Sequence, residues 1–380
     1  MKLNIKTNIL IDKSYKNLSE EINFKKFKKI VLIVDKKIYQ FNYIKKIVST
    51  LKKEIKVKGI FFFEEPHEPT YEYLDKSVNF FRKNNKSLFD AIIVIGGGST
   101  MDFAKGCAIL SKNFKSAINY MGFPKNIKDP IPVITIPSTT STGSEIIYNA
   151  VFTSKKMNKK LGINSEKNFP IITFYDPKII ALAPKEIIIY SALATFNRAI
   201  ESFVFSKGNF LTKEISRHAF DLVRINLPKY LKTKNLEYLK KLQLAGSLSI
   251  IALSNSGGGC SGILNYYFST NFAIPQAKSF SITALEILKF NINNKFHEYK
   301  NILQSKKLLE FKKIVKSMEN ILLSQKKKKS SLNLSSNLNK VNYDLSNKLD
   351  MISSRNNIRI KQADLIKLTK KITRYIDEVR

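Results

Sequence analysis

The chain has 380 residues, of which 43% are hydrophobic and 25% are charged. This composition is typical of a folded globular protein and excludes an intrinsically disordered chain. The formal net charge of +35 would suit a nucleic-acid binder. Lysine supplies most of that charge, however, and arginine, whose planar fork suits bases and phosphates, is rare. We therefore expect no nucleic-acid partner.

The sequence also bears on where the protein is found. No apolar stretch approaches the ~20 residues that span a bilayer, and the start of the chain is not followed by the apolar core of a signal peptide. The two cysteines cannot form a disulfide framework. We expect a cytoplasmic protein with no membrane partner.

The first half of the chain alternates apolar runs with helical patterns. Continuous runs of this kind predict strands that are buried on both faces of a parallel sheet. Between them, Leu74, Val78 and Phe81 recur at helical spacing. Strands that alternate with helices indicate a doubly wound α/β domain. The predicted strands cover residues 30–34, 59–63, 91–95 and 132–136.

From about Pro184 onward, helical patterns dominate and strand-like runs largely disappear. Residues 324–350 are rich in Lys, Ser and Asn, so we expect them to be loosely ordered. The lysine run at 326–329 is expected to be a solvated loop. The sequence thus predicts an α/β domain over residues 1–183 and an all-α domain over 184–380, meeting at a cleft. The predicted helices of the second domain cover residues 186–205, 236–253, 272–290 and 364–379.

Two polar loops follow predicted strands. Gly96-Gly97-Gly98 lies between a strand and a helix, where glycines let the backbone approach a phosphate and the helix N-terminus offers free N–H groups. Residues 137–145 are dense in hydroxyl groups. Without a ligand, the glycines could simply form a tight turn, and the hydroxyl-rich loop could simply cap the next helix. Together, the two loops favour a nucleotide site at the edge of the sheet.

Asp35 ends another predicted strand. A carboxylate in that place can accept hydrogen bonds from a ribose hydroxyl. It can equally be the N-cap of the next helix.

Residues 96–105, with the sequence GGGSTMDFAK, resemble the GGGSxxDxAK motif of iron-containing alcohol dehydrogenases. That superfamily includes glycerol dehydrogenase and, more distantly, dehydroquinate synthase. Residues 137–145 are similar to the family's second nucleotide loop, and Asp176-Pro177 and residues 199–202 match its DP and AIE segments. The resemblance covers residues 25 to about 290 and implies the dehydroquinate synthase-like fold.

Within the family, residues 67–70 and 160–165 look most like one particular branch. That branch oxidises the C8 alcohol of 3-deoxy-manno-octulosonate, a lipopolysaccharide sugar acid.

The resemblance implies an NAD cofactor, with NADP as a possible substitute. By this resemblance, Asp35 would select NAD, and residues 97–99 would hold the pyrophosphate. Thr139 and Thr142 would face the adenine and nicotinamide side of the site, and Lys160 would reach a ribose hydroxyl. The implied cofactor-binding residues are Asp35, Gly96, Gly97, Gly98, Ser99, Thr139, Thr142 and Lys160.

The sequence departs from the family at the metal site. Family members hold a divalent metal with one Asp and three His, the first two of which lie one helical turn apart. The corresponding positions here read Ala194, Arg198, Gly262 and Gln276. A methyl, a guanidinium and a hydrogen cannot bind a metal, and one amide oxygen is too weak. The only histidines, at positions 67, 218 and 297, form no ligand-spaced pair, so we predict no catalytic metal.

Arg198 is the candidate catalytic residue, because a fixed cation can stabilise the alkoxide that the metal would otherwise stabilise. Alternatively, Arg198 pairs with Glu201 one turn later and fills space. Asp102 and Lys105 are expected to anchor the helix behind the glycine turn.

The function expected on these grounds is an NAD(P)-dependent oxidoreductase acting on an alcohol or aldehyde of a small polar substrate, with a 3-deoxy-octulosonate sugar acid as one candidate. Two alternatives stay open: a non-catalytic dinucleotide-binding homologue or partner subunit, and a metal-free lyase or cyclase. By analogy with the family, we expect a homo-oligomer.

Overall fold

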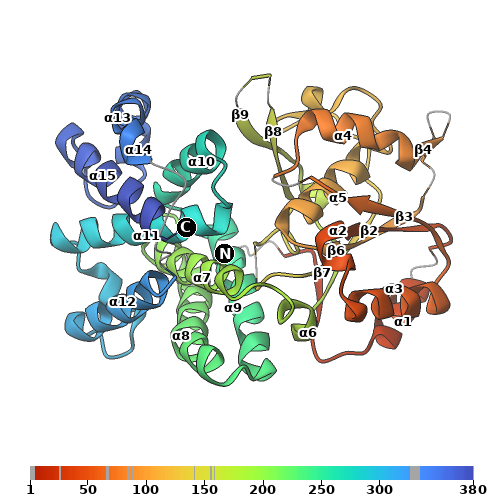
Figure 1. The fold of residues 1–380 in the computed structure, drawn as a ribbon, viewed down its shortest axis with the longest axis horizontal. Helices are drawn as coiled ribbons and strands as arrows, with labels where there is room; N and C mark the ends of the chain where they lie inside the picture. The colour runs from red at the N-terminus through yellow and green to blue at the C-terminus, as the bar shows by residue number, and fades with distance from the viewer. Residues whose placement is uncertain are drawn as a thin grey trace. The chain divides into compact units, whose positions relative to one another are not determined.

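The computed structural model describes residues 5–24, 27–65, 68–83, 86–87, 89–140, 142–154, 156–157, 159–325 and 334–379. Two compact units make up the chain (Figure 1). The first unit is Asn4–Pro184 with Asn235–Gln243, and the second contains Lys185–Lys234 and Leu244–Arg380. The division lies beside the boundary predicted at 183/184, except that residues 235–243 group with the first unit.

The first unit contains a six-stranded parallel sheet. All four predicted strands are present as its central strands and one edge. Two three-residue strands at the other end were not predicted, because so short a run shows no periodicity. The strand order is β1 (Asn8–Leu10), β10 (Ile172–Phe174), β7 (Val133–Pro137), β6 (Ala91–Gly96), β2 (Ile30–Asp35) and β3 (Val57–Phe63).

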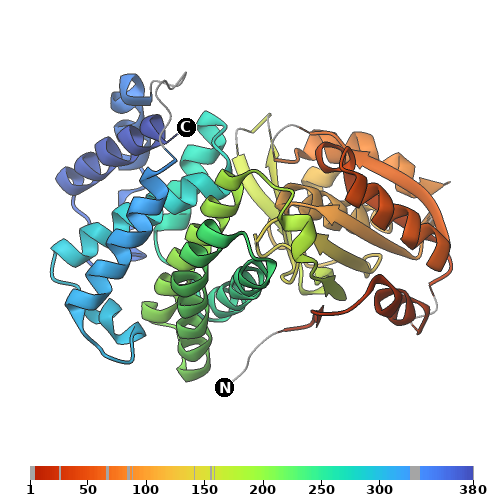
Figure 2. The ribbon, with the colours of Figure 1, turned by 60° about the horizontal axis from the view of Figure 1, so that its bottom comes forward.

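Alternate residues of the central strands pack against helices on opposite faces of this sheet. Val31 and Val94 point to the face covered by α4 and α5, whereas Leu32 and Ile93 point to the face covered by α1 and α3. The two layers of helices flank the sheet in Figure 2, which confirms the doubly wound arrangement. These helices are α1 (Tyr15–Phe24), α3 (Asn42–Glu54), α4 (Tyr71–Ser77) and α5 (Gly98–Leu110).

Two antiparallel ladders and several short helices complete this unit. The longer ladder pairs β8 (Asn149–Ser154) with β9 (Lys159–Asn164). The other pairs β4 (Arg82–Lys83) with β5 (Lys86–Ser87). The short helices are α2 (Lys36–Tyr39), η1 (Val78–Phe81), η2 (Ala117–Tyr120), η3 (Glu166–Asn168) and α6 (Pro177–Ile180).

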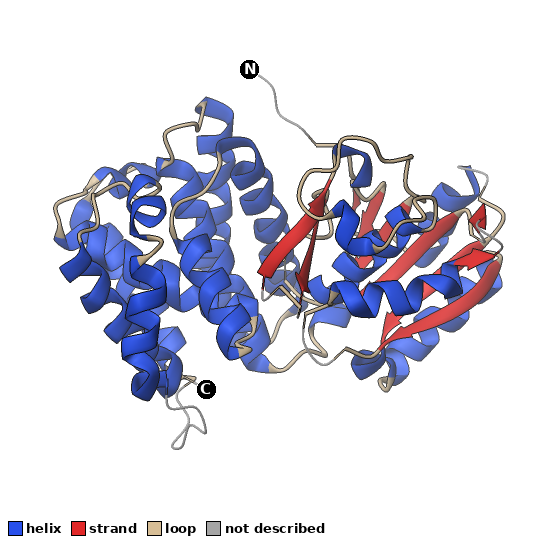
Figure 3. Cartoon of the chain, turned by 90° about the horizontal axis from the view of Figure 1, so that it is seen from above, coloured by secondary structure: helices blue, strands red, loops and turns tan. Residues whose placement is uncertain are grey.

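Helices and connecting loops make up the described residues of the second unit, which contain no strand (Figure 3). Its central helix, α7, contacts α8 and α11 along much of its length. The helices are α7 (Lys185–Val204), α8 (Phe210–Thr233), α9 (Leu236–Ser256, of which the first turns belong to the other unit), α10 (Ser261–Phe272), α11 (Gln276–Asn293), η4 (Glu298–Ile302), α12 (Leu308–Leu323), η5 (Leu334–Asn337), α13 (Leu338–Ser346), α14 (Leu349–Ser354) and α15 (Gln362–Glu378).

Two expectations need correction here. Helix α7 is long and apolar enough to span a bilayer by length and composition, but 78% of that stretch is buried inside the protein, as in a core helix. Residues 334–350, expected to be loosely ordered, are mainly helical, because Leu334, Val341 and Leu345 bury an apolar stripe. The lysines at 326–329 lie outside the described residues.

A network of charges joins three helices of the second unit. Lys289 of α11 lies 2.7 Å from Glu286 and 2.8 Å from Glu319 of α12. Lys316 lies 2.8 Å from Glu319, and the Tyr375 hydroxyl of α15 donates to the same carboxylate. Burial alone would raise the pKa of Glu319, but the hydrogen bonds from Lys289, Lys316 and Tyr375 lower it to about 2.

This network predicts an acid-sensitive contribution to stability. Because the pKa of Glu319 is lower in the folded state than its ordinary 4.5, its contribution is present above pH 4.5 and is lost as the pH falls toward 2. Glu319→Gln should cost ~2 kcal/mol of unfolding free energy at pH 7 and much less at pH 3. Urea unfolding of both proteins between pH 3 and pH 7 measures this loss of unfolding free energy, with Glu310→Gln, at an exposed position, as control. A cost that does not change with pH would contradict the assignment.

Candidate functional site

The carboxyl ends of β2, β6 and β7 lie side by side, with Val34 opposite Ile95 and Gly96 opposite Pro137. The chain runs from β2 outward to β3 and then returns to the other side of β2 to form β6, so the strand order reverses at this point. Open α/β sheets bind ligands outside the carboxyl ends of strands at such a reversal. The structure therefore brings the two predicted loops and Asp35 to one edge.

The glycine turn is in contact with the hydroxyl-rich loop. The Ser138 N–H donates to the Gly96 carbonyl at 2.8 Å. A Cβ on Gly98 would lie 2.8 Å from the Thr142 side chain, and one on Gly96 would lie 2.6 Å from Thr100. Glycine is thus required at both places by the close approach of neighbouring side chains.

Gly97 has a different environment. It precedes α5 as its N-cap, and its carbonyl accepts from the Met101 N–H at 3.0 Å. A Cβ on Gly97 would meet Thr139 at 3.6 Å, which is an ordinary contact. The fold therefore tolerates a methyl group here, so a requirement for glycine at this position would come from a ligand.

Polar groups of the two loops face this edge. The Thr139 hydroxyl oxygen is buried and has no hydrogen-bond partner in the protein. Thr142 donates to Glu145 at 3.4 Å, and Ser99 is partly exposed at the start of α5. Ser141 lies outside the described residues. An orphaned hydroxyl next to the N-terminus of a helix fits a bound phosphate-containing ligand.

Asp35 ends β2, as predicted. It is also the N-cap of α2, which was one of the two roles considered for it. Its Oδ1 accepts from the Lys37 N–H at 2.9 Å, and its Oδ2 accepts from the Thr100 hydroxyl at 3.4 Å. Burial raises the pKa of Asp35, opposed by the Lys37 N–H and charge and by the Thr100 hydrogen bond.

Lys160, the lysine expected to reach a ribose hydroxyl, has a charged partner within the protein. It lies on β9 with its side chain only 2% exposed, and its ammonium group forms an ion pair with Glu68. Its contact with a ribose hydroxyl stays a prediction, and its pairing with Glu68 was not foreseen from the sequence. Nothing in the residue pattern pairs two segments so far apart in the chain. His67, next to Glu68, lies outside the described residues.

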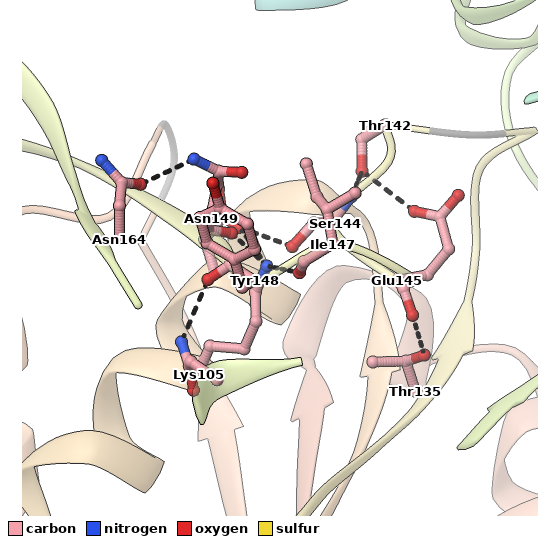
Figure 4. A network of polar contacts seen from close by, with 11 residues as sticks. Lys105, Thr135, Thr142, Ser144, Glu145, Ile147, Tyr148, Asn149 and Asn164 are labelled. Atoms are coloured by element: carbon pink, nitrogen blue, oxygen red, sulfur yellow. Dashed lines mark hydrogen bonds and ion pairs between the residues drawn. The ribbon is translucent and has the colours of Figure 1, made fainter. Parts of the chain in front are cut away.

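The helix behind the glycine turn is held by a fully buried lysine (Figure 4). The Lys105 ammonium lies 3.3 Å from Asp102 and donates to the carbonyls of Ile147 and Asn149. The Ser144 hydroxyl donates to Asp102. Burial raises the pKa of Asp102 and lowers that of Lys105, and their mutual attraction opposes both shifts.

Further hydrogen bonds extend this network (Figure 4). The Thr135 hydroxyl of β7 donates to the Glu145 carbonyl at 3.1 Å. The Asn149 amide of β8 donates to Asn164 of β9 at 2.8 Å. Residues 142–149 are thus tied to the sheet, to α5 and to the β8–β9 hairpin. Asp102 and Lys105 have the anchoring contacts that we expected of them.

In the second unit, the family's ligand positions lie on α7, α10 and α11. Ala194 packs with Phe280 and Ala284. The Arg198 guanidinium lies 5.7 Å from the centre of the Phe280 ring and donates to the Ser249 hydroxyl at 3.3 Å. An aromatic ring thus contacts the face of α7 where two metal ligands would be required.

The other two positions are also unsuited to a metal. A Cβ on Gly262 would find no neighbour within 4 Å, and Gln276 is exposed at the start of α11. His218 is exposed on α8, and His297 precedes η4. Among the residues that the structure describes, no three His, Cys, Asp or Glu side chains gather as a metal would require. The donor groups present do not fit the family's metal.

The buried ion pair predicts a large effect on stability. Lys105→Met should lower the unfolding free energy by ~3–5 kcal/mol, because it leaves Asp102 buried without its cation. The exposed Lys46→Met on α3 is the matched control and should change stability by less than ~0.5 kcal/mol. Chemical denaturation measures both. Equal effects of the two substitutions would show that Lys105 is not an anchor.

Comparison with known proteins agrees with this geometry. Residues 7–177 match the iron-containing alcohol dehydrogenase family, and residues 188–372 match the C-terminal family of Fe-containing alcohol dehydrogenases. Alcohol dehydrogenase 4 of Schizosaccharomyces pombe is 24% identical over 72% of this chain and 64% of its own length. The NAD-dependent methanol dehydrogenase of Bacillus methanolicus is 23% identical over 72% of this chain and 71% of its own.

Solved structures share the fold. A 1,3-propanediol oxidoreductase superposes with a TM-score of 0.84 at 17% identity, covering 98% of this chain and 100% of that one. A sulfoacetaldehyde reductase from Bifidobacterium kashiwanohense in complex with NAD+ gives 0.82 at 18% identity, covering 98% of both chains. With matches to both family descriptions across most of its length, the chain belongs to the iron-containing alcohol dehydrogenase family.

Proposed function

We propose that this protein is an NAD-dependent oxidoreductase that acts on an alcohol or aldehyde of a small polar substrate. The observation that carries the proposal is the convergence of the glycine turn and the orphaned Thr139 hydroxyl at the reversal of strand order. The names of relatives support the cofactor: one is an NAD-dependent methanol dehydrogenase, and one solved neighbour contains NAD+.

In this proposal the chain's residues bind and orient the cofactor. The N–H groups of Gly98 and Ser99, at the N-terminus of α5, hold the pyrophosphate and benefit from the positive end of the helix. The Thr139 hydroxyl gains the hydrogen bond that it lacks. The Asp35 carboxylate favours the ribose hydroxyls of NAD over the 2′-phosphate of NADP by charge repulsion, so NADP binds more weakly. When bound, the nicotinamide accepts or donates a hydride.

We propose that turnover proceeds without the family's metal. In the family, the metal stabilises the alkoxide from which the hydride leaves. The donor groups at the four positions here do not fit a metal, and Arg198 supplies a permanent positive charge in its place. Phe280 and Ser249 hold the guanidinium in a defined position.

We propose the substrate class from charge and resemblance. Arg198 would suit an anionic group, and the net charge of +35 attracts small anions at long range. A 3-deoxy-octulosonate sugar acid is the candidate that we propose from the resemblance of residues 160–165. We propose a cytoplasmic homo-oligomer. A screen of NAD reduction with sugar acids and small diols, with and without Zn²⁺ or Fe²⁺, would identify the substrate.

A second candidate function is a non-catalytic dinucleotide-binding homologue. The observation that favours it is the contact of the Phe280 ring with Ala194 and Arg198, because this aromatic group replaces catalytic ligands with packing. A metal-free lyase or cyclase, which holds the nucleotide without net turnover, is the third outcome. NADH production in the substrate screen supports the oxidoreductase, whereas NAD binding without any production supports one of the other two.

A substitution in the proposed cofactor site should impair NAD binding without destabilising the free protein. Gly97→Ala should leave the melting temperature of the free protein within a few degrees, because its methyl group has room. It should abolish the rise in melting temperature that millimolar NAD gives the unmodified protein, because the methyl occupies ligand space. Gly98→Ala is the contrasting variant and should destabilise the free protein by crowding Thr142. No NAD-induced shift in the unmodified protein would refute the site.

The metal-free proposal makes its own prediction. Purified protein should contain no stoichiometric iron or zinc, and chelators should change neither stability nor turnover. Once a substrate is known, Arg198→Ala should lower kcat by ~10²–10³. If Arg198 only fills space, the same change should leave kcat unaltered. Elemental analysis that finds one tightly bound metal per chain would contradict the proposal.

A further inference from the structure

One turn beyond Arg198, helix α7 carries a second charged group, Glu201. Its Oε1 atom is buried and has no hydrogen-bond partner. The carboxylate lies against the turn before α10, where a Cβ on Gly259 would come within 2.8 Å of that oxygen. Such a group is costly to bury in its ionised form unless hydrogen bonds or an opposite charge compensate it.

A second orphaned oxygen lies beside it. Oδ1 of Asn197, one helical turn before Glu201, is also buried and has no partner. Both residues line one cavity of about 10 Å³, together with Tyr299 of η4 and apolar side chains of α7 and α11. This volume suits a single water molecule. Two acceptors cannot satisfy each other, so a hydrogen must come from a water or from a protonated Glu201.

The charged surroundings of Glu201 are defined on each side. Burial raises its pKa to about 7, opposed by Ser261, Arg198 and the Gly259 N–H. The titratable groups that face it are Arg198 on its own helix, Cys260 before α10 and Tyr299 on η4. The α11 residues that line the cavity, Ala284, Ile287 and Leu288, are apolar. Arg198 is therefore the charge most able to couple to Glu201.

We propose that Glu201 is a positioning residue that takes up and releases one proton through the cavity, and thereby sets the charge around Arg198. With Glu201 protonated, the guanidinium no longer faces the negative charge of this carboxylate. With Glu201 ionised, its negative charge lies one helical turn from the guanidinium and offsets part of that positive charge. The proton exchange stands on the orphaned oxygens and the shared cavity, whereas the use of Arg198 by a substrate rests on the proposed function.

This arrangement couples the binding of an anion beside Arg198 to the protonation of Glu201. A carboxylate or alkoxide beside Arg198 is stabilised more when Glu201 is neutral, so its binding draws a proton onto Glu201. By reciprocity, acid conditions strengthen anion binding by the same factor. The elements on which the effect depends, α7 and the start of α10, belong to one unit of the fold.

Stability against pH tests the proton exchange without any substrate. The pKa of Glu201 is raised in the folded state from 4.5 to about 7, so its favourable contribution is complete below pH 4.5 and is lost as the pH rises through 7. Glu201→Gln mimics the neutral form at every pH. The ratio of unfolding constants, unmodified over variant, should therefore increase by ~10²-fold between pH 4.5 and pH 8. Glu214→Gln, a half-exposed carboxylate on α8, is the control and should show no such trend.

Two further measurements keep the proposal falsifiable if the variant folds poorly. Infrared difference spectra of the unmodified protein should show a protonated carboxyl band at pH 5.5 that disappears at pH 8.5. Arg198→Gln should move that transition to higher pH, because it removes the charge that favours ionised Glu201. Absence of the band at pH 5.5, or a pH-independent ratio of unfolding constants, would overturn the proposal. Neither readout requires turnover, so failure of the proposed activity would not imitate either result.

Discussion

The edge of the sheet proposed to bind the nucleotide depends on one buried lysine. Lys105 has no exposed surface, and its ammonium group holds together two pieces of chain that the sheet alone would not connect. It joins α5, whose N-terminus forms the glycine turn, to the segment that ends in β8. Because that segment also carries Thr142 against Gly98, the geometry of the site follows from this ion pair. Burial of the pair is costly, and the surrounding carbonyls and Ser144 offset the cost.

The edge of the sheet could be predicted from the sequence because its signals are local. Continuous apolar runs marked β2, β3, β6 and β7, and each polar loop directly follows its strand. Parallel pairing then places the carboxyl ends together. The partners of the charged residues could not be predicted in this way. Glu68 and Lys160 lie far apart in the chain, so their ion pair depends on how the β8–β9 hairpin packs.

The helical unit shows the same limit. A Lys/Ser/Asn-rich composition indicated loose order for residues 324–350, yet α13 forms there because a few apolar residues at helical spacing outweigh the polar remainder. The spacing of the family's four ligand positions along the sequence was enough to show that all four are substituted. The packing of the Phe280 ring beside these positions could not be predicted, because the sequence does not show what an aromatic residue in a helix contacts. Helix α7 therefore carries a packed aromatic contact, a cation and a buried carboxylate along the face where the resemblance implies metal ligands.

The central proposal is that this chain keeps the family's cofactor site and works without its metal. Calorimetric titration of NAD into protein dialysed against a strong chelator tests both parts at once. The account predicts saturable binding of one NAD per chain, with the same affinity before dialysis and after it. Binding that disappears on dialysis and returns with added Fe²⁺ or Zn²⁺ would contradict the account.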